Sequence, residues 1–492
     1  MTDAATNPAD SPAPTPAQLA ETLSGPLADL PSPLPLAPPT RTRGQAPINA
    51  TIRPPGSKSL TNRALLLAAL ADGESVLHRP LLAADDAQRM MAALTTLGVT
   101  FDTSTPNTLR IRGTGGRWHN PTPHPPSVPE TVLDLNNAGT ATRFLAAASM
   151  LADHPLVITG NERMRQRPIA ELTEALASLG AQIEFLESPG CPPVRITPPI
   201  GGLLTTSTLT LGVTQSSQFI SALLLVGGCL PAGLTLRLPD GVTSRSYVEM
   251  TLALLATLDA PAKSSADLSV IRVDRHVGPF TLEIEPDASG ATCFHAAGAI
   301  LPDATVRVIG PSAEDSLQGD AAFPGVLKQM GCSVITGATK NGDLTTTTRG
   351  PRSPDTLKPI MVDMADMPDA VMALAAVAAF TPGTTIVRGV RTLRVKETDR
   401  ISALQAELAK VGVTVTPNLN DDPDALSITP PPDGIDCSPS CEPVTFDTYD
   451  DHRIAMSLSL IALRRPNVLI NDPQCVAKTY PQYWAQFAEL YR

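Results

Sequence analysis

The chain has 492 residues, of which 42% are apolar and 17% charged, a composition that is ordinary for a globular protein and excludes wholesale disorder. Its formal charge of −11 argues against a nucleic-acid-binding protein, because such proteins gather basic residues on their surface. Proline, with 50 residues, is about twice as frequent as the usual ~5%.

The chain begins with a proline-rich stretch that is predicted to be a disordered leader over residues 1–44. Residues 1–40 hold ten prolines, contain no Lys or Arg and show no amphipathic period. Their acidic residues and the lack of an apolar segment argue against a targeting peptide. We therefore expect that residues 1–40 can be removed without loss of activity. Two later proline-rich stretches, 121–129 and 430–443, are predicted to be surface loops.

The seven cysteines are scattered along the chain, and their number is odd. Cys437 and Cys441 are the only close pair, and no His or second Cys pair stands near them to complete a zinc site. The longest apolar run, 219–230, is too short to span a bilayer. These features predict a cytoplasmic protein with reduced thiols and no metal site.

Two sequence patterns recur about every 80 residues along the rest of the chain. One is an amphipathic helix that ends at Gly and is followed by a β-branched strand, as in 90–101, 326–335 and 404–415. Ordinary α/β alternation also looks periodic, but matched occurrences of both patterns favour true repeats and predict an α/β fold of six units. The second pattern is a polar cluster followed by a helix rich in Ala and Leu, starting at Gly56, Asn136, Thr214, Glu285, Ala365 and Tyr449.

The polar clusters are predicted to bind a small ligand with several negative charges. They stand at helix starts, where free backbone N–H groups and the positive end of the helix dipole favour anions. The acidic chain would thus gather its cations in one place. The clusters include Lys58, Ser59, Arg63, Asn137, Thr140, Arg143, Ser216, Ser217, Gln218, His452 and Arg453, and similar residues open second helices at Arg167, Ser244, Tyr247, Lys396, Arg400 and Lys478.

Known nucleotide motifs do not fit these clusters. Residues 56–59 (GSKS) lack the first Gly of a P-loop, and no G-x-G-x-x-G follows a strand, so ATP and dinucleotides are disfavoured. Asp450, Asp451 and His452 could in isolation be metal ligands, but capping of a helix by the two aspartates is favoured.

Two carboxylates among the cations form a candidate proton-transfer pair. Asp369 opens an otherwise apolar helix, and Glu397 lies in the sequence KETDR at 396–400. On an arbitrary helix, KETDR would be explained by solvated i,i+4 ion pairs. One strand–helix–strand segment can nevertheless bring Asp369 and Glu397 together, where cations would stabilise their ionised forms and burial would oppose them.

Seven segments in register resemble the 5-enolpyruvylshikimate-3-phosphate synthase family from about residue 45 to the C-terminus. They are PGSKSLTNR (55–63), NNAGTATR (136–143), RMRQRPI (163–169), SSQF (216–219), RVKETDR (394–400), YDDHRIAM (449–456) and AKTYP (477–481). The resemblance implies two similar domains, each of three βαβαββ units in an inverse α/β-barrel-like arrangement, that close like a clamp. It implies that 45–57 and 286–492 form one domain, that 58–285 form the other, and that the active site lies in the interdomain cleft.

The resemblance also implies the reaction, which is transfer of the enolpyruvyl group of phosphoenolpyruvate to the 5-hydroxyl of shikimate 3-phosphate, through a tetrahedral intermediate and without a cofactor. Asp369 would accept the hydroxyl proton, and Glu397 would protonate the methylene carbon with help from Lys58. Shikimate 3-phosphate would contact Lys58, Ser59, Arg63, Ser216, Ser217, Gln218, Ser244, Tyr247, Asp369 and Lys396. Phosphoenolpyruvate would contact Lys58, Asn137, Gly139, Arg167, Gln218, Arg400, His452, Arg453 and Lys478.

One position departs from the family pattern. Phe144 stands where many members have Pro, behind the phosphoenolpyruvate pocket, so sensitivity to the inhibitor glyphosate does not follow from the resemblance. We expect a monomer that acts on these two small molecules and binds neither nucleic acid nor membrane.

Two alternatives stay open, the related UDP-N-acetylglucosamine enolpyruvyl transferase and a non-catalytic anion binder. The first is expected to carry Asn after its Lys and a reactive Cys on a loop, whereas Ser59 follows Lys58 here and no Cys precedes Cys191. The second would have no need of the carboxylates Asp369 and Glu397.

Overall fold

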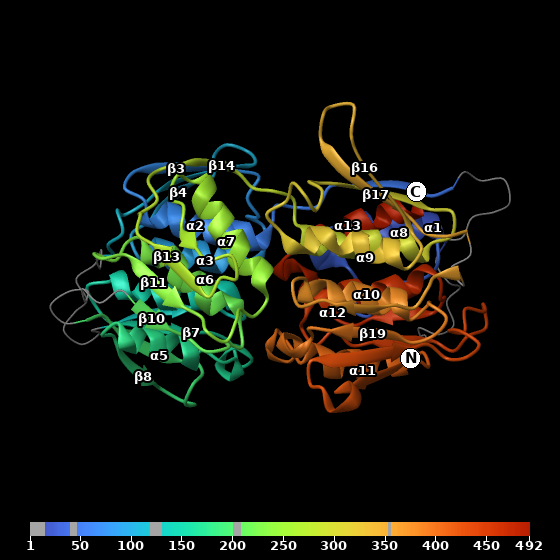
Figure 1. The fold of residues 1–492 in the computed structure, drawn as a ribbon. Helices are drawn as coiled ribbons and strands as arrows, with labels where there is room; N and C mark the ends of the chain where they lie inside the picture. The colour runs from blue at the N-terminus through green and yellow to red at the C-terminus, as the bar shows by residue number, and fades with distance from the viewer. Residues whose placement is uncertain (1–14, 40–46, 119–129, 200–207, 353–355) are drawn as a thin grey trace, which may run out of the picture.

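The computed structural model describes residues 15–39, 47–118, 130–199, 208–352 and 356–492. The chain forms two lobes that lie side by side (Figure 1). Each lobe has its own hydrophobic core, and one core is built from residues between Leu60 and Ile284. The other core combines residues from the first part of the chain with residues after Ala291. We call these the 58–285 lobe and the C-terminal lobe, the latter including the described residues before 58.

Among the described residues, six small sheets, three in each lobe, share one plan, although β1–β23–β22 has three strands instead of four. In the sheet β6–β7–β9–β8, β6 is parallel to β7, while β7 and β8 are both antiparallel to β9. The 58–285 lobe contains β3 (Glu74–His78), β4 (Thr100–Asp102), β5 (Thr108–Arg112), β6 (Thr131–Asp134), β7 (Leu156–Thr159), β8 (Gln182–Phe185), β9 (Val194–Thr197), β10 (Thr208–Thr210), β11 (Leu234–Arg237), β12 (Lys263–Ser264), β13 (Val270–Val273) and β14 (Thr281–Glu283).

The sheets of the C-terminal lobe follow the same plan with strands that are far apart in sequence. Their orders are β16–β17–β15–β2, β18–β19–β21–β20 and β1–β23–β22. The strands are β1 (Leu34–Leu36), β2 (Asn49–Ile52), β15 (Thr305–Ile309), β16 (Ser333–Ala338), β17 (Leu344–Arg349), β18 (Met361–Asp363), β19 (Thr385–Arg388), β20 (Thr414–Pro417), β21 (Ala425–Thr429), β22 (Val444–Phe446) and β23 (Val468–Ile470).

The helices that follow the polar clusters are buried on nearly all sides, as their apolar sequences predict. Every residue of α4 and of α10 is buried. The helices of the 58–285 lobe are α2 (Lys58–Leu70), α3 (Asp85–Thr96), α4 (Gly139–Ala148), α5 (Ala170–Ser178), α6 (Ser217–Gly227) and α7 (Arg245–Thr257). The C-terminal lobe has α1 (Pro16–Ser24), α8 (Ala288–Ile300), α9 (Phe323–Gln329), α10 (Val371–Ala378), α11 (Arg400–Ala409), α12 (His452–Leu458) and α13 (Tyr483–Phe487).

The chain passes between the lobes twice, after β2 and after β14, and the two passages are bonded to each other. The Ser57 N–H donates to the Glu285 carbonyl at 2.8 Å, and the Asp287 N–H donates to the Pro55 carbonyl at 2.7 Å. Both connections therefore leave each lobe at the same place.

Several predictions from the sequence are confirmed. The fold is α/β and is built from six similar units. Residues 430–443 connect β21 to β22 without a helix or strand, whereas 121–129 lie outside the described residues. All seven cysteines lie within the described residues and are free thiols. Among the described residues, no helix is both long enough and apolar enough to cross a membrane.

The prediction of a disordered leader over 1–44 is wrong for residues 15–39, while 1–14 and 40–44 lie outside the described residues. Helix α1 starts with a capping box in which Thr15 and Gln18 satisfy each other's backbone N–H groups. Its prolines do not oppose structure, because Pro16 occupies the first helical turn and Pro35 lies on the edge strand β1, which pairs antiparallel with β23. The leucines of this segment are buried in the core of the C-terminal lobe.

We expect residues 15–39 to contribute to stability, whereas the sequence predicts only that activity survives removal of residues 1–40. Leu23 is 0% exposed, so Leu23→Ala should lower the free energy of unfolding by about 2–5 kcal/mol through lost burial and a new cavity. Denaturant unfolding followed by circular dichroism measures this. The exposed neighbour Glu21 is the matched control, since Glu21→Ala should change stability by less than about 0.5 kcal/mol. Equal stability of both variants would contradict a packed α1.

Candidate active site

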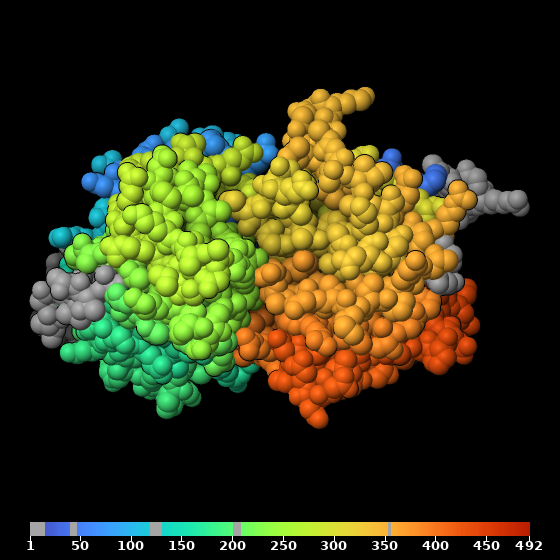
Figure 2. All heavy atoms as spheres, viewed as in Figure 1, coloured from blue at the N-terminus to red at the C-terminus, as the bar shows by residue number. Residues whose placement is uncertain are grey.

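A cavity lies between the two lobes, where residues of both line about 830 Å³ of space that no protein atom fills. On the face shown in Figure 2 the lobes touch along most of their common border. The C-terminal lobe contributes Asp369, Thr392, Val395, Lys396 and Glu397 to the lining. The 58–285 lobe contributes Lys58, Ser59, Arg63, Asp86, Gly139, Thr140, Arg143, Arg167, Pro168, Gln215, Ser216, Ser217, Gln218, Phe219, Ser244 and Tyr247.

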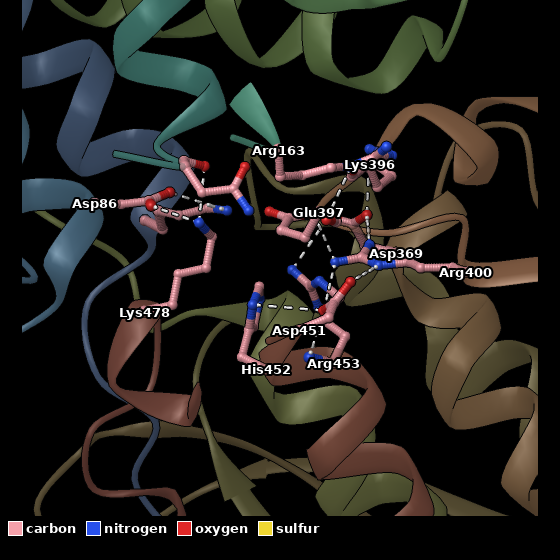
Figure 3. Close-up of polar contacts among 12 residues, drawn as sticks. Asp86, Arg163, Asp369, Lys396, Glu397, Arg400, Asp451, His452, Arg453 and Lys478 are labelled. Atoms are coloured by element: carbon pink, nitrogen blue, oxygen red, sulfur yellow. Dashed lines mark hydrogen bonds and ion pairs between the residues drawn. The ribbon is translucent and has the colours of Figure 1, made fainter. Parts of the chain in front are cut away.

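Most of the residues that the sequence singled out line this one cavity. They are Lys58, Ser59, Arg63, Gly139, Thr140, Arg143, Arg167, Ser216, Ser217, Gln218, Ser244, Tyr247, Asp369, Lys396 and Glu397. The remaining predicted residues lie directly behind the lining and contact it or its partners (Figure 3); these are Asn137, Arg400, His452, Arg453 and Lys478.

Helix starts bring these side chains together. Ser216 caps α6 by accepting the Gln218 N–H at 3.2 Å, and Ser57 caps α2 immediately before Lys58. Helix α12 begins at His452 with Asp451 as its N-cap, so of the two aspartates predicted to cap only Asp451 does so. Unpaired N–H groups at several helix ends therefore add to the positive charge of the cavity.

Arg400 is the centre of a buried ion-pair cluster (Figure 3). Its Nη1 lies 2.9 Å from Asp369 Oδ1, its Nη2 lies 2.9 Å from Glu397 Oε2, and its Nε lies 2.8 Å from Asp451 Oδ2. Burial alone would lower the pKa of the guanidinium, but the three carboxylates raise it above its ordinary value. One permanently charged arginine thus fixes the positions of both predicted catalytic carboxylates.

Asp369 is surrounded by cations. Lys396 Nζ lies 3.3 Å from its Oδ1, and Arg453 Nη2 lies 3.1 Å from its Oδ2. Burial raises the pKa of this carboxyl, but Arg453, Lys396, Arg400 and Lys58 overcome that effect and hold it well below the usual range. Asp369 is therefore ionised at neutral pH and able to accept a proton.

Glu397 is also ionised in the absence of ligand. Burial opposes its charge, but Arg400, Arg167, Lys478 and Lys58 hold its pKa well below the usual range. An anionic ligand bound among these cations would neutralise part of their field and would raise the pKa of Glu397. An anionic ligand in the cavity therefore favours protonation of Glu397.

Gly139, the first residue of α4, lets the backbone come close to the buried guanidinium of Arg167. Arg167 donates from Nη1 to the side-chain oxygen of Asn137 at 3.1 Å. A Cβ on Gly139 would lie 2.6 Å from Arg167 Nη2, so a larger residue would displace the guanidinium.

The buried ring of His452 has no hydrogen-bond partner at either nitrogen among the described residues, and burial together with Arg453 lowers its pKa well below the usual value. His452 is therefore a neutral ring at pH 7.

Most N–H donors of Arg63 are used inside the 58–285 lobe. Nε donates to Thr251 Oγ1 at 2.8 Å, Nη1 to the Ser59 carbonyl at 2.9 Å, and Nη2 to the Tyr247 carbonyl at 3.1 Å. Burial lowers its pKa to about 10, so that Arg63 remains charged and adds its positive charge to one wall of the cavity.

Sequence reasoning missed three residues of the site. Asp86 pairs with Lys58 at 3.5 Å and with Lys478 at 3.4 Å, and Asp320 accepts from the Tyr247 hydroxyl at 3.2 Å. Neither aspartate carries a sequence signal beyond its place near a helix start. Arg163 lies within the singled-out segment 163–169, and its guanidinium donates to backbone carbonyls of the other lobe, among them that of Glu397 at 3.1 Å.

Among the described residues, no three His, Cys, Asp or Glu side chains are grouped so that they could hold a metal ion. The cavity instead presents a dense set of cations around two carboxylates, which suits a ligand that carries phosphate and carboxylate groups.

Comparison with known proteins gives consistent matches over most of the chain. A family model described as EPSP synthase (3-phosphoshikimate 1-carboxyvinyltransferase) matches residues 42–487. A 3-phosphoshikimate 1-carboxyvinyltransferase from Enterobacter sp. (strain 638) is 40% identical over 448 residues, which cover 90% of this chain and 97% of the relative. The protein of the same description from Vibrio cholerae is 39% identical over 448 residues, with the same coverage of both chains.

Solved structures resemble the whole two-lobed architecture. The EPSP synthase from Acinetobacter baumannii is 25% identical, with a TM-score of 0.69 over 91% of this chain and 96% of that one. The enolpyruvyl transferase NikO from Streptomyces tendae, 18% identical, superposes with a TM-score of 0.62 over 92% of this chain and 95% of the other, which shows the shared fold.

Proposed function

The chain belongs to the EPSP synthase (3-phosphoshikimate 1-carboxyvinyltransferase) family, and on this basis we propose which residues of its cavity bind each substrate and which of them transfer protons. The enzyme transfers the enolpyruvyl group of phosphoenolpyruvate to the 5-hydroxyl of shikimate 3-phosphate and releases phosphate. The reaction is an addition–elimination through a tetrahedral intermediate and belongs to the shikimate pathway of aromatic amino-acid biosynthesis. The UDP-N-acetylglucosamine alternative is not favoured by these matches.

We propose that residues 45–57 and 286–492 form one domain, which the described residues 15–39 join in the C-terminal lobe, and that residues 58–285 form the other. The division of the hydrophobic cores at Leu60 and Ile284 supports these boundaries. Because each domain supplies part of the cavity lining, closure of the lobes would complete the site and exclude water from the intermediate.

Shikimate 3-phosphate is proposed to bind mainly to the 58–285 lobe. Its phosphate would meet the hydroxyls of Ser216, Ser217 and Ser244, which line the cavity at the starts of α6 and α7. Its ring would lie against Gln218 and Tyr247. Its remaining groups would contact the cationic and polar residues Lys58, Ser59, Arg63 and Lys396 and the carboxylate of Asp369.

Phosphoenolpyruvate is proposed to bind where the cations are most concentrated, between the two lobes. Guanidinium forks match carboxylate and phosphate oxygens, and an ammonium adds charge without a fixed direction. The free ring nitrogens of His452 are further candidates for contact with this ligand. The proposed set is Lys58, Asn137, Gly139, Arg167, Gln218, Arg400, His452, Arg453 and Lys478.

The chemistry is proposed to run between the two carboxylates that share Arg400. Asp369 takes the proton of the 5-hydroxyl of shikimate 3-phosphate while the hydroxyl oxygen bonds to C2 of phosphoenolpyruvate. Glu397 gives a proton to C3 of phosphoenolpyruvate, and Lys58 assists this transfer. The Glu397 carboxylate then takes a proton back from C3 as the carbon–oxygen bond to phosphate breaks, which forms the enol ether and releases phosphate. The observation that carries this assignment is that Asp369 and Glu397 both line the cavity and both contact one buried guanidinium.

The assignment of Asp369 is tested by its amide. Phosphate release from the unaltered enzyme should require both shikimate 3-phosphate and phosphoenolpyruvate. Asp369→Asn should lower kcat by at least ~100-fold, because an amide cannot accept the hydroxyl proton. The matched control is Asp303→Asn, an exposed change in the same lobe that should leave kcat unchanged. Full activity of the Asp369 variant would remove Asp369 from this role.

A monomer in the cytoplasm is proposed as the working form. One chain supplies the whole cavity lining, so that no second copy is needed to complete the site. The seven free thiols, all within the described residues, are typical of a reducing compartment.

A further inference from the structure

A third carboxyl group lies behind Asp369, and the mechanism above does not use it. The hydroxyl oxygen of Tyr247 lies 3.4 Å from Asp369 Oδ2 and 3.2 Å from Asp320 Oδ2. The Ser289 hydroxyl donates a short hydrogen bond to the same oxygen of Asp320. A continuous line of polar atoms therefore runs from Asp369 through Tyr247 to Asp320.

Asp320 contacts Tyr247 and also lines a second cavity. The residue is only 3% exposed, and its other oxygen, Oδ1, has no hydrogen-bond partner among the described residues. Asp320 lines a second cavity of about 360 Å³, together with Asp287 and His295. Most of this lining is apolar, and Asp320, Asp287, His295 and Thr346 supply its polar side chains, which are the natural contacts for water there.

The charges around Asp320 favour exchange of a proton. Burial and the negative charges of Asp369 and Asp287 raise its pKa to about 6, while Arg453 and the Ser289 hydroxyl partly counteract them. Burial, together with the negative charges of Asp320 and Asp369, also raises the pKa of Tyr247, which therefore stays a neutral hydroxyl. Tyr247 can donate its hydrogen to only one of the two carboxylates at a time while its oxygen accepts from the other side.

The line of polar atoms exists only when the lobes are together. Tyr247 belongs to α7 of the 58–285 lobe, whereas Asp320 and Asp369 belong to the C-terminal lobe. The neighbouring residue Ser246 holds this contact, because its N–H donates to Asp366 Oδ1 at 3.2 Å and its hydroxyl donates to the Asp366 carbonyl.

We propose that Tyr247 and Asp320 form a relay that carries the hydroxyl proton of shikimate 3-phosphate from Asp369 to the second cavity. Protonated Asp369 gives its proton to the Tyr247 oxygen while Tyr247 gives its own proton to Asp320. Asp369 is then a carboxylate again, Tyr247 is unchanged, and Asp320 is a neutral acid that returns the proton to water. The relay rests on the proposed role of Asp369 as proton acceptor.

The test uses the full-length enzyme with Asp320→Asn, whose amide cannot accept a proton. The kcat of phosphate release, which depends on the return of Asp369 to its charged form after each turnover, should fall by at least ~10-fold, a modest effect for proton transfer, while the KM of each substrate changes by less than about twofold. Below about pH 6 the unaltered enzyme should slow as Asp320 becomes protonated, and the variant should lack this acid limb. Asp315→Asn, an exposed change in the preceding loop, is the matched control.

Ser289→Ala gives a second measurement that does not depend on the folding of the Asp320 variant. Loss of the Ser289 hydrogen bond removes support for the charged form of Asp320, so the acid limb should move to higher pH while the rate above it is kept. A limb at the same pH in this variant, or an unchanged kcat in Asp320→Asn, overturns the relay. If Asp369→Asn is inactive while Asp320→Asn behaves like the unaltered enzyme, the relay alone is wrong and the proposed function stands.

Discussion

Glu397→Gln is expected to lower the rate of enolpyruvyl transfer by at least ~100-fold, the lower end of the effect of a general acid. The amide keeps the size of the side chain and can still contact Arg400, so the cluster of Figure 3 should stay in place. It cannot give a proton to C3 of phosphoenolpyruvate. The measurement is phosphate release under saturating concentrations of both substrates.

The pH profile gives an independent readout of the same step. Glu397 works as an acid, so the rate should fall as pH rises through the pKa that Glu397 has with phosphoenolpyruvate bound. The amide variant should lack this alkaline limb. Glu314→Gln, an exposed change in the same lobe, should behave like the unaltered enzyme. A Glu397 variant with an unaltered rate and profile would exclude Glu397 as the acid.

Arg400→Met is expected to cause the largest loss of stability. Arg400 is 1% exposed and neutralises three buried carboxylates, those of Asp369, Glu397 and Asp451. Methionine would fill much of the space but would leave the carboxylates facing one another, at a cost of about 3–5 kcal/mol in the free energy of unfolding. Activity should be lost together with stability. Denaturant unfolding at pH 7.5 measures the effect.

The sign of the pH dependence separates lost charge from lost packing. The pKa values of Asp369 and Glu397 are depressed in the folded enzyme, so their contribution to stability is present above their unfolded pKa values and is lost as pH falls through the folded ones. Without Arg400 the pKa values of Asp369 and Glu397 in the folded enzyme should rise. Protonation of these carboxylates near pH 4.5 should then restore part of the lost free energy of unfolding. The exposed Arg391 is the control, since Arg391→Met should cost less than about 0.5 kcal/mol. An equal penalty for Arg400→Met at both pH values would show that packing dominates.

The repeated part of the fold could be predicted because its signals are local. Neighbouring residues are enough to predict an apolar helix that begins with polar residues, or a strand that follows Gly. Six repetitions of the same order then identify the units. The same reasoning placed Lys58, Ser216 and Glu397 near helix starts, and these residues line one cavity.

What could not be predicted depends on contacts between distant segments. Asp86 gains its role only because α3 is placed against Lys478, which is almost four hundred positions later in the chain. Asp320 is an ordinary aspartate until Tyr247 of the other lobe reaches it. The wrong prediction for residues 15–39 has another cause. High proline content is typical of disorder, but Thr15, Gln18 and the spacing of Leu19 and Leu23 are those of a short capped helix.

The pairing of β1 with β23 has a consequence for the order in which the molecule assembles. Leu34 lies opposite Ile470, so β1 finds its partner only after residues near the other end have been synthesised, and β2 must wait for β15, which begins at Thr305. The 58–285 lobe closes its core with contacts inside its own span and can form while the ribosome is still translating the rest. The enzyme is therefore expected to mature from its middle outward, with its two ends joining last.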